Sequence, residues 1–188
     1  MFDALGAASA DPEGSTRQHG IVRAMTSRVE LRHAYPEPPE RMLEVLTDPD
    51  YLRDKLHAVG GPNAELVSWE DDERGITVVL RQAVPAAALP SVVRSFLPGD
   101  LTIHRTETWT NSGGRVRAAV DGAPGTITGI MSLEPDPAGS VLALLLEATV
   151  GLPFIGGKVE KAITGGVSRL MTAEYDFTMQ WLRDSTNP

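Results

Sequence analysis

One histidine stands where its side chain could do chemistry. The stretch 27–35 alternates apolar and polar residues, as a half-buried strand does, and His33 shares its phase with Val29 and Leu31. A buried imidazole at this position could donate a hydrogen bond to a ligand or act as an acid or a base. The alternative is a core histidine paired with backbone, because no carboxylate partner is recognisable nearby in the sequence.

Two charged residues share one phase of another strand-like stretch, 101–110. Arg105, Glu107 and Trp109 are two residues apart and therefore share one face of the predicted strand. If this phase faces inward, both charges lie at the mouth of a cavity, where they would form a polar anchor for the head group of a ligand. Buried charges are costly unless they are paired. The alternative is a bulge in this strand, or ion pairs across the surface.

Large or adaptable side chains are the remaining candidates for a cavity lining. They are Trp69, Phe96, Trp109, Met131, Met171 and Tyr175. Side chains of these types at these spacings also form ordinary core, so both interpretations stay open. Phe96 differs from the others because it lies on the insertion 85–99, which could act as a lid.

A long terminal helix is the element that must position several of these residues. Between 158 and 183, apolar or small residues recur every three or four positions, which predicts a helix of about 39 Å with one apolar stripe. Its middle section, with Gly166, Leu170 and Met171, is expected to border a cavity. Gly165 and Gly166 each cost about 1 kcal/mol relative to alanine. They therefore predict either close approach of a strand, which is the preferred interpretation, or room for a ligand.

Most of the chain before this helix has the pattern of strands. After 27–35, two short helices are expected, one opened by Pro39 and one capped by Asp48. Further strands are predicted at 65–70, 75–84, 101–110, 115–121, 126–133 and 140–150. The order predicts an α+β domain in which a curved antiparallel sheet of about seven strands wraps around the long C-terminal helix.

Composition and charge limit the function classes. The 188 residues fit a single domain at 27–184, after a leader at 1–26 that we expect to be flexible, with Met25 as an alternative start. There is no cysteine, and the four histidines lack metal-ligand spacing, so we expect no metal and no other cofactor. The net charge of −8 argues against nucleic-acid binding. With no secretory signal and no transmembrane segment recognisable, a cytoplasmic location is expected.

Several stretches resemble the START-like superfamily, also called SRPBCC or helix-grip, and most closely its uncharacterised actinobacterial family DUF2505. They are the opening strand into Tyr35-Pro36, the segment Leu-Thr-Asp-Pro-Asp-Tyr at 46–51, Thr-Glu-Thr-Trp at 106–109, and 151–160 before the last helix. The resemblance covers 27–183. It implies an elongated hydrophobic cavity between the sheet and the long helix. Relatives bind lipids, sterols, polyketides or quinones, and a minority are enzymes, including cyclases and aromatases.

Three hypotheses about function follow. The first is a non-enzymatic carrier or sensor of a small hydrophobic molecule such as a lipid, polyketide or quinone, because no catalytic motif is found and no catalytic residue is assigned. The second is a cyclase- or aromatase-like enzyme in which His33, Arg105 or Glu107 orients a polyketide-like substrate, which requires at least two of them in one pocket. The third is an interaction module that uses segment 85–99.

Overall fold

The computed structural model describes residues 25–186 apart from 90, 96–98, 123–124 and 151–155. Residues 1–24 of the predicted leader and Phe96 therefore lie outside the described residues, as does the linker 151–155 before the last helix. Met25 and Thr26, which were expected in the leader, belong to the first strand instead. Among the helices that are described, none is both long enough and apolar enough to cross a membrane.

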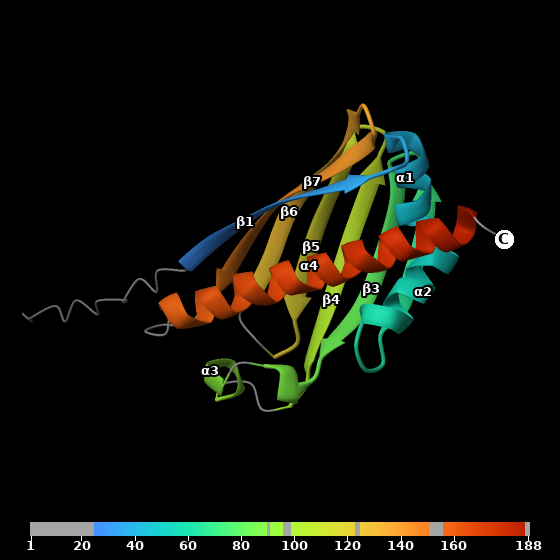
Figure 1. The fold of residues 1–188 in the computed structure, drawn as a ribbon. Coiled ribbons are helices and arrows are strands. Elements are labelled where there is room, and N and C mark those ends of the chain that lie inside the picture. Colours follow the sequence, from blue (N-terminus) through green and yellow to red (C-terminus); the bar gives the residue numbers. More distant parts are fainter. Residues whose placement is uncertain (1–24, 90, 96–98, 123–124, 151–155, 187–188) are drawn as a thin grey trace, which may run out of the picture.

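One antiparallel sheet of seven strands makes up most of the described structure (Figure 1). The strands are β1 (Met25–Tyr35), β2 (Glu65–Asp72), β3 (Gly75–Val84), β4 (Leu101–Thr110), β5 (Gly113–Val120), β6 (Gly125–Asp136) and β7 (Gly139–Val150). Their order in the sheet is β1-β7-β6-β5-β4-β3-β2. All strands after β1 thus form a meander of sequence neighbours. Strand β1 pairs with β7 and forms one edge of the sheet. The predicted number of strands is confirmed.

Two short helices follow β1, as predicted. Helix α1 (Pro39–Thr47) begins with proline, whose fixed φ and missing N–H suit the first turn. Asp48 separates it from α2 (Pro49–Val59), and its Oδ1 accepts hydrogen bonds from the backbone N–H groups of Asp50 and Tyr51 at 2.9 and 2.8 Å. These bonds satisfy donors that the first turn of a helix leaves free. In the described part of the segment between β3 and β4 there are two short helices, η1 (Ala86–Ala88) and α3 (Ser91–Arg94).

The terminal helix α4 (Gly156–Thr186) runs diagonally across one face of the sheet (Figure 1). Its 31 residues correspond to a length of about 46 Å. It packs against β1 and α2, and it covers a core contributed by the inward phases of the strands. The predicted α+β architecture, with the sheet wrapped around this helix, is confirmed.

The register of β4 determines which of its side chains face α4. Arg105 pairs with Leu80 and Glu107 with Val78 of β3, and the pairing continues without a register shift along the strand. Directly opposed residues share a face of the sheet, and both partners are fully buried. The register therefore excludes a bulge at this point of β4, and both charges point inward.

Candidate functional site

Three elements bring four charged side chains together inside the domain. Arg105 and Glu107 come from β4, Glu174 from α4 and Lys55 from α2, and all four are buried. The guanidinium of Arg105 lies between the two carboxylates and binds both. Its Nη1 donates to both oxygens of Glu174, at 2.8 and 3.1 Å, and its Nη2 contacts Glu107. We call these four residues the charged cluster.

Neutral donors complete the surroundings of the two carboxylates. The indole Nε1 of Trp109 donates to Glu107 Oε2 at 2.9 Å, and the amide of Gln82 donates to Glu174 Oε1 at 3.1 Å. Each carboxylate thus has a cation and a neutral donor, as a buried charge requires. The Nε–H of Arg105 is different, because it is buried without an acceptor in the part of the chain that the structure describes.

The ion pairs of the cluster outweigh the cost of burying Glu174. Burial by itself raises the pKa of this carboxyl, but the positive charges of Arg105 and Lys55 and the hydrogen bond from Gln82 lower it to about 2. For Arg105 burial acts in the opposite direction, yet the two carboxylates raise its pKa further above its usual range. Glu174 and Arg105 are therefore both ionised at neutral pH.

Lys55 is buried without a complete set of hydrogen bonds. Its side chain is 4% exposed, its Nζ lies 3.7 Å from Glu174 Oε2, and the ring of Tyr51 is 5.5 Å from the same nitrogen. The first distance is an ion pair but too long for a hydrogen bond. An ammonium group has three N–H donors. Among the described residues none of the three meets an acceptor at hydrogen-bond distance.

A hydroxyl chain fixes α2 to α4 beside the cluster. Thr178 donates its hydroxyl proton to the backbone carbonyl of Glu174 at 2.6 Å, and the hydroxyl of Tyr51 lies 2.7 Å from Thr178 Oγ1. Because Thr178 has only one proton to give, Tyr51 is the donor of the second bond. Burial raises the pKa of Tyr51 above its usual range, so the phenol keeps its proton.

A cavity of about 30 Å³ lies between α2, α4 and the sheet, next to the charged cluster. It has both charged and apolar walls. The residues that line it are His33, Tyr35, Leu46, Tyr51, Lys55, Arg105, Glu107, Trp109, Met131, Leu142, Leu144, Met171, Glu174, Tyr175 and Thr178. A space of this size holds one or two water molecules, or a single small polar group.

His33 lies on the cavity wall and stacks on an aromatic ring. The rings of His33 and Tyr175 are 4.7 Å apart, and the hydroxyl of Tyr175 donates to the carbonyl of Ala34 at 3.2 Å. Burial lowers the pKa of His33, although the charges of Asp176 and Glu174 raise it in part. The imidazole is therefore neutral at physiological pH and can accept or donate one hydrogen bond at each nitrogen.

The structure brings most of the sequence-predicted site residues to this one cavity. Those that line it are His33, Arg105, Glu107, Trp109, Met131, Met171 and Tyr175. Phe96 lies outside the described residues. Leu170 packs at the edge of the core, and neither it nor Gly166 is part of the cavity wall.

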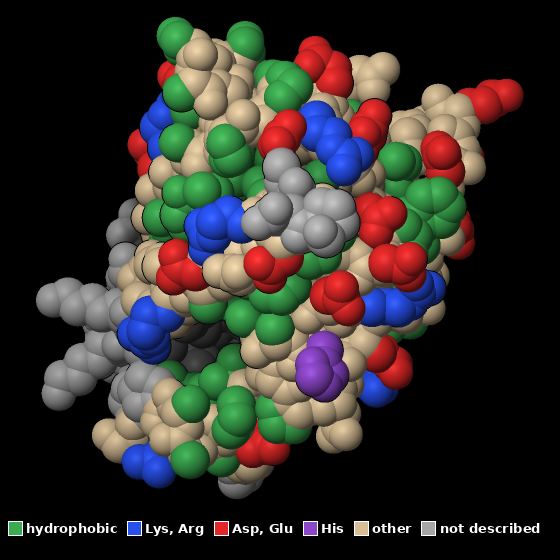
Figure 2. All heavy atoms as spheres, turned by 45° about the vertical axis from the view of Figure 1, so that its right-hand side comes forward, with side chains coloured by type: hydrophobic (Ala, Val, Ile, Leu, Met, Phe, Trp, Pro, Cys, Tyr) green, Lys and Arg blue, Asp and Glu red, His purple; other side chains and the backbone are tan. Residues whose placement is uncertain are grey.

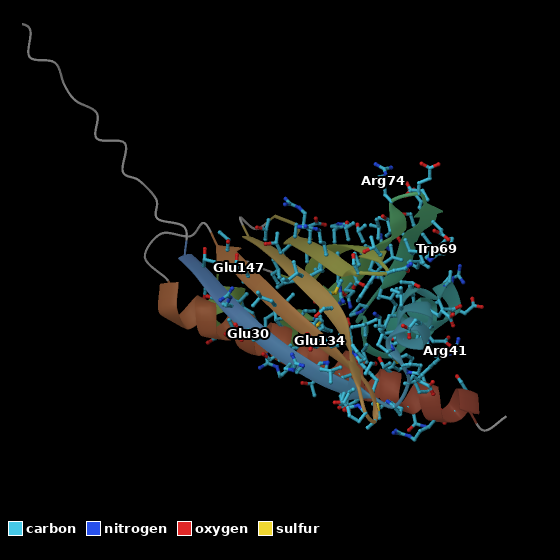
Figure 3. All side chains as sticks on the ribbon, turned by 90° about the horizontal axis from the view of Figure 1, so that it is seen from above. Glu30, Arg41, Trp69, Arg74, Glu134 and Glu147 are labelled. Atoms are coloured by element: carbon cyan, nitrogen blue, oxygen red, sulfur yellow. The ribbon has the colours of Figure 1, made fainter. Side chains whose placement is uncertain are left out.

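Trp69 lies away from the cavity. It belongs to β2 at the edge of the sheet, where it is 38% exposed, and its indole Nε1 donates to the carbonyl of Thr47 at the end of α1. Figure 3 shows it at the β2 side of the molecule. The expected position in a cavity lining is therefore not found, because on this edge strand the side chain seals the end of α1.

The glycine pair in α4 does not mark close packing. Among the described residues, a Cβ built on Gly165 or Gly166 would meet only the side chain of Arg169, about one turn further along the same helix, at 3.4 and 4.0 Å. The preferred interpretation, close approach of a strand, was wrong. Close approach occurs instead at Gly114 in β5, where a Cβ would lie 2.8 Å from Trp109 and 2.9 Å from Met131, both cavity residues.

Lys55 and Glu174 are the site residues that the sequence analysis missed. Each interrupts an apolar helical face: Lys55 lies four residues after Tyr51, and Glu174 lies three residues after Met171. Residues three and four apart share one face of a helix. A charge within an apolar stripe was therefore the signal that could have identified both.

Taken together, a seven-stranded sheet wrapped around a terminal helix, with a cavity between them, defines a helix-grip fold. The same fold is found in a protein of unknown function, SA2116, from Staphylococcus aureus, with a TM-score of 0.60 at 14% identity over 89% of this chain and 99% of that one. It is also found in the Zhui aromatase/cyclase from Streptomyces sp. R1128, with a TM-score of 0.58 at 12% identity over 87% and 97%.

The family assignment is closer than these structural likenesses. The model of the family "Protein of unknown function (DUF2505)" matches residues 30–182, so the chain belongs to this family. The uncharacterized protein Rv0481c from Mycobacterium tuberculosis is 36% identical over 121 residues, which are 61% of this chain and 70% of the relative. A protein from Mycobacterium bovis, Mb0491c, matches with the same values. The predicted family is confirmed.

Proposed function

We propose that the protein binds or carries a small, mainly apolar molecule with one polar group, held between the sheet and α4. The observation that carries this proposal is a single cavity bordered both by the charged cluster and by apolar side chains. The apolar members are Leu46, Trp109, Met131, Leu142, Leu144 and Met171. Small-molecule sites in proteins combine such a wall with a few polar groups that orient the ligand.

The size of the cavity limits how much of a ligand it can hold. A volume of about 30 Å³ accommodates the polar group of a ligand and not its apolar part. Met131 and Met171 both line the space, and methionine side chains adapt to new shapes at low cost. The unfilled surroundings of Gly165 and Gly166 offer further room along α4. In addition, the face of the molecule displayed in Figure 2 has a hollow, with hydrophobic side chains along its lower rim.

The test is native mass spectrometry of the protein purified from its native host, followed by solvent extraction. We expect a co-purifying lipid-like compound that extraction removes. Gly166→Leu should lower its occupancy more than it lowers the unfolding midpoint, because leucine fills the free space beside α4. Ala58→Leu, at an exposed position of α2, is the matched control and should keep full occupancy. A protein without any bound compound, whose stability no apolar compound raises, would contradict the proposal.

A second candidate function is proton-transfer catalysis of the cyclase or aromatase kind. It is supported by the fact that His33, Arg105 and Glu107 border the same cavity. A neutral imidazole is a suitable base for a carbon acid, and the guanidinium could stabilise the enolate oxygen.

The corresponding assay follows hydrogen–deuterium exchange at the central carbon of an aryl diketone by NMR. We expect the protein to accelerate this exchange, His33→Gln to abolish the acceleration, and His57→Gln on the exposed side of α2 to preserve it. Equal rates with and without protein would exclude this candidate and leave the carrier proposal in place.

A further inference from the structure

Two donors next to the cavity have no acceptor at hydrogen-bond distance among the described residues, and one of them, Nε of Arg105, is fully buried. The ammonium group of Lys55 meets no oxygen closer than Glu174 Oε2 at 3.7 Å within the described part of the chain. The Nε–H of Arg105 is buried and unpaired in the same part. Both side chains border the cavity. A buried donor without a partner costs about 1–3 kcal/mol, and more when the group is charged, so an acceptor oxygen placed here would be well stabilised.

The charges of the cluster are already balanced. Lys55 and Arg105 supply two positive charges, and Glu107 and Glu174 supply two negative ones, within 4.0 Å of each other in pairs. A ligand carboxylate would add a third negative charge, and no further Lys or Arg among the described residues borders the cavity to compensate it. An uncompensated buried charge is strongly unfavourable. The balance therefore disfavours an anionic head group such as that of a fatty acid.

The remaining choice is between neutral oxygen groups. A hydroxyl brings a proton that itself requires an acceptor. Of the buried acceptors near the cluster that lack a hydrogen-bond donor, Gln82 Oε1 does not border the cavity, and Glu107 Oε1 is ion-paired with Arg105, so the proton would compete with that pair. A carbonyl brings only acceptor capacity. It matches the two unpaired donors without creating a new unsatisfied group.

We propose that the ligand of this cavity is an uncharged carbonyl compound, a ketone or a related neutral molecule, whose oxygen accepts hydrogen bonds from Lys55 and from Nε of Arg105. This inference rests on the proposed ligand-binding function and deepens it by naming the ligand class. Lys55 is then a binding residue, and the apolar wall around Trp109 and Met131 contacts the rest of the molecule.

Three probes of the same shape separate the possibilities. Benzylacetone has a ketone, hydrocinnamate has a carboxylate in the same place, and isopentylbenzene has no oxygen there. Dissociation constants for the wild-type protein at neutral pH are measured from amide chemical shifts in NMR titrations. We expect benzylacetone to bind at least about tenfold more tightly than either of the other two, which is the usual effect of a hydrogen bond from a charged donor.

Two variants test the assignment to Lys55. Lys55→Met keeps the length and apolar stem of the side chain and should lower the affinity for benzylacetone toward that for isopentylbenzene, with the hydrogen bond from Arg105 Nε left in place. Arg53→Met removes an exposed cation from the same helix and should leave all three affinities unchanged. A circular dichroism melt of each variant shows that it is folded, and the wild-type comparison does not depend on either of them.

The outcomes distinguish this inference from the proposal beneath it. Equal binding of benzylacetone and isopentylbenzene would overturn the carbonyl inference and leave an apolar ligand site. Tighter binding of hydrocinnamate would overturn it in favour of an anion site. If none of the three perturbs residues around the cavity even at millimolar concentration, ligand binding in this cavity is itself refuted, together with the inference that rests on it.

Discussion

The last turns of α4 and its middle section face the same sheet in different ways. Around Glu174 and Thr178 the helix is tied down by ion pairs to Arg105 and Lys55 and by the hydroxyl of Tyr51. Around Gly165 and Gly166, no described atom of another element comes within 4 Å of where a side chain would begin. One helix thus combines an anchored half with a section that has room beside it.

This difference shows how a packed domain can also admit a ligand. Aromatic contacts add to the anchored half, since the ring of Tyr51 lies 5.3 Å from Trp181 and 6.0 Å from Phe177. Buried contacts of this kind give a segment high local stability, and segments with few of them open more easily. The anchored half can therefore preserve the fold while the middle section adjusts. The following predictions test this contrast.

Removing the central cation should have the largest effect. Arg105→Met leaves the buried carboxylates of Glu107 and Glu174 without their shared partner. We expect the free energy of unfolding in urea to fall by about 3–5 kcal/mol. Arg32→Met, which breaks the exposed ion pair with Glu134, is the control and should cost less than about 1 kcal/mol. Equal losses would show that the cluster is no stronger than a surface pair.

Acid should weaken the anchored half through Glu174. The folded-state pKa of this carboxyl is about 2, below the ordinary value of 4.5. A carboxyl group whose pKa is lower in the folded than in the unfolded chain stabilises the fold at pH values above the unfolded-state pKa. This contribution is lost as the pH falls from about 4.5 toward 2. Denaturant unfolding across this range should therefore show a steeper loss for the wild type than for Glu174→Gln. Parallel pH profiles of the two proteins would contradict this prediction.

Gly114 should tolerate no side chain, in contrast to the glycine pair of α4. In Gly114→Ala the new methyl group would lie 2.8 Å from Trp109 and 2.9 Å from Met131. Overpacking of this kind costs about 1–3 kcal/mol, which chemical denaturation measures directly. Because both neighbours border the cavity, the near-UV circular dichroism signal of the tryptophans should change as well. A variant as stable as the wild type would mean that the two side chains move aside freely.

Gly166→Ala should have the smallest effect and the opposite sign. Its methyl group has free space, since the nearest described atom that it would meet, apart from the adjacent backbone of α4, is Arg169 Nη2 at 4.0 Å. Alanine favours the helix over glycine by about 1 kcal/mol, so the thermal midpoint should rise slightly. A decrease would reveal close packing in the middle of α4 and would remove the contrast between its two halves.

Local patterns in the sequence were sufficient to predict the helices and strands and some of the residues of the site. A period of two requires that Arg105, Glu107 and Trp109 share one face of β4, and the predicted bounds of that strand, 101–110, are those observed. Asp48 and the prolines defined the start of α2 in the same local way. Signals of this kind act over a few residues, so they can be read without knowing the fold.

Only the tertiary structure decided which charges meet and how much space they leave. Glu174 lies 69 residues after Arg105 in the chain, and the ammonium of Lys55 comes from a third element. Their meeting depends on the crossing of α4 over β4 and on the packing of α2 beside it. The sequence alone determined the strands, the main helices and the fact that Arg105 and Glu107 share one face of β4, whereas the register with β3 decided that this face points inward. Packing between distant elements determined the partners, the cavity volume and the free space beside Gly166, because side-chain volumes from several elements must be combined before a cavity exists.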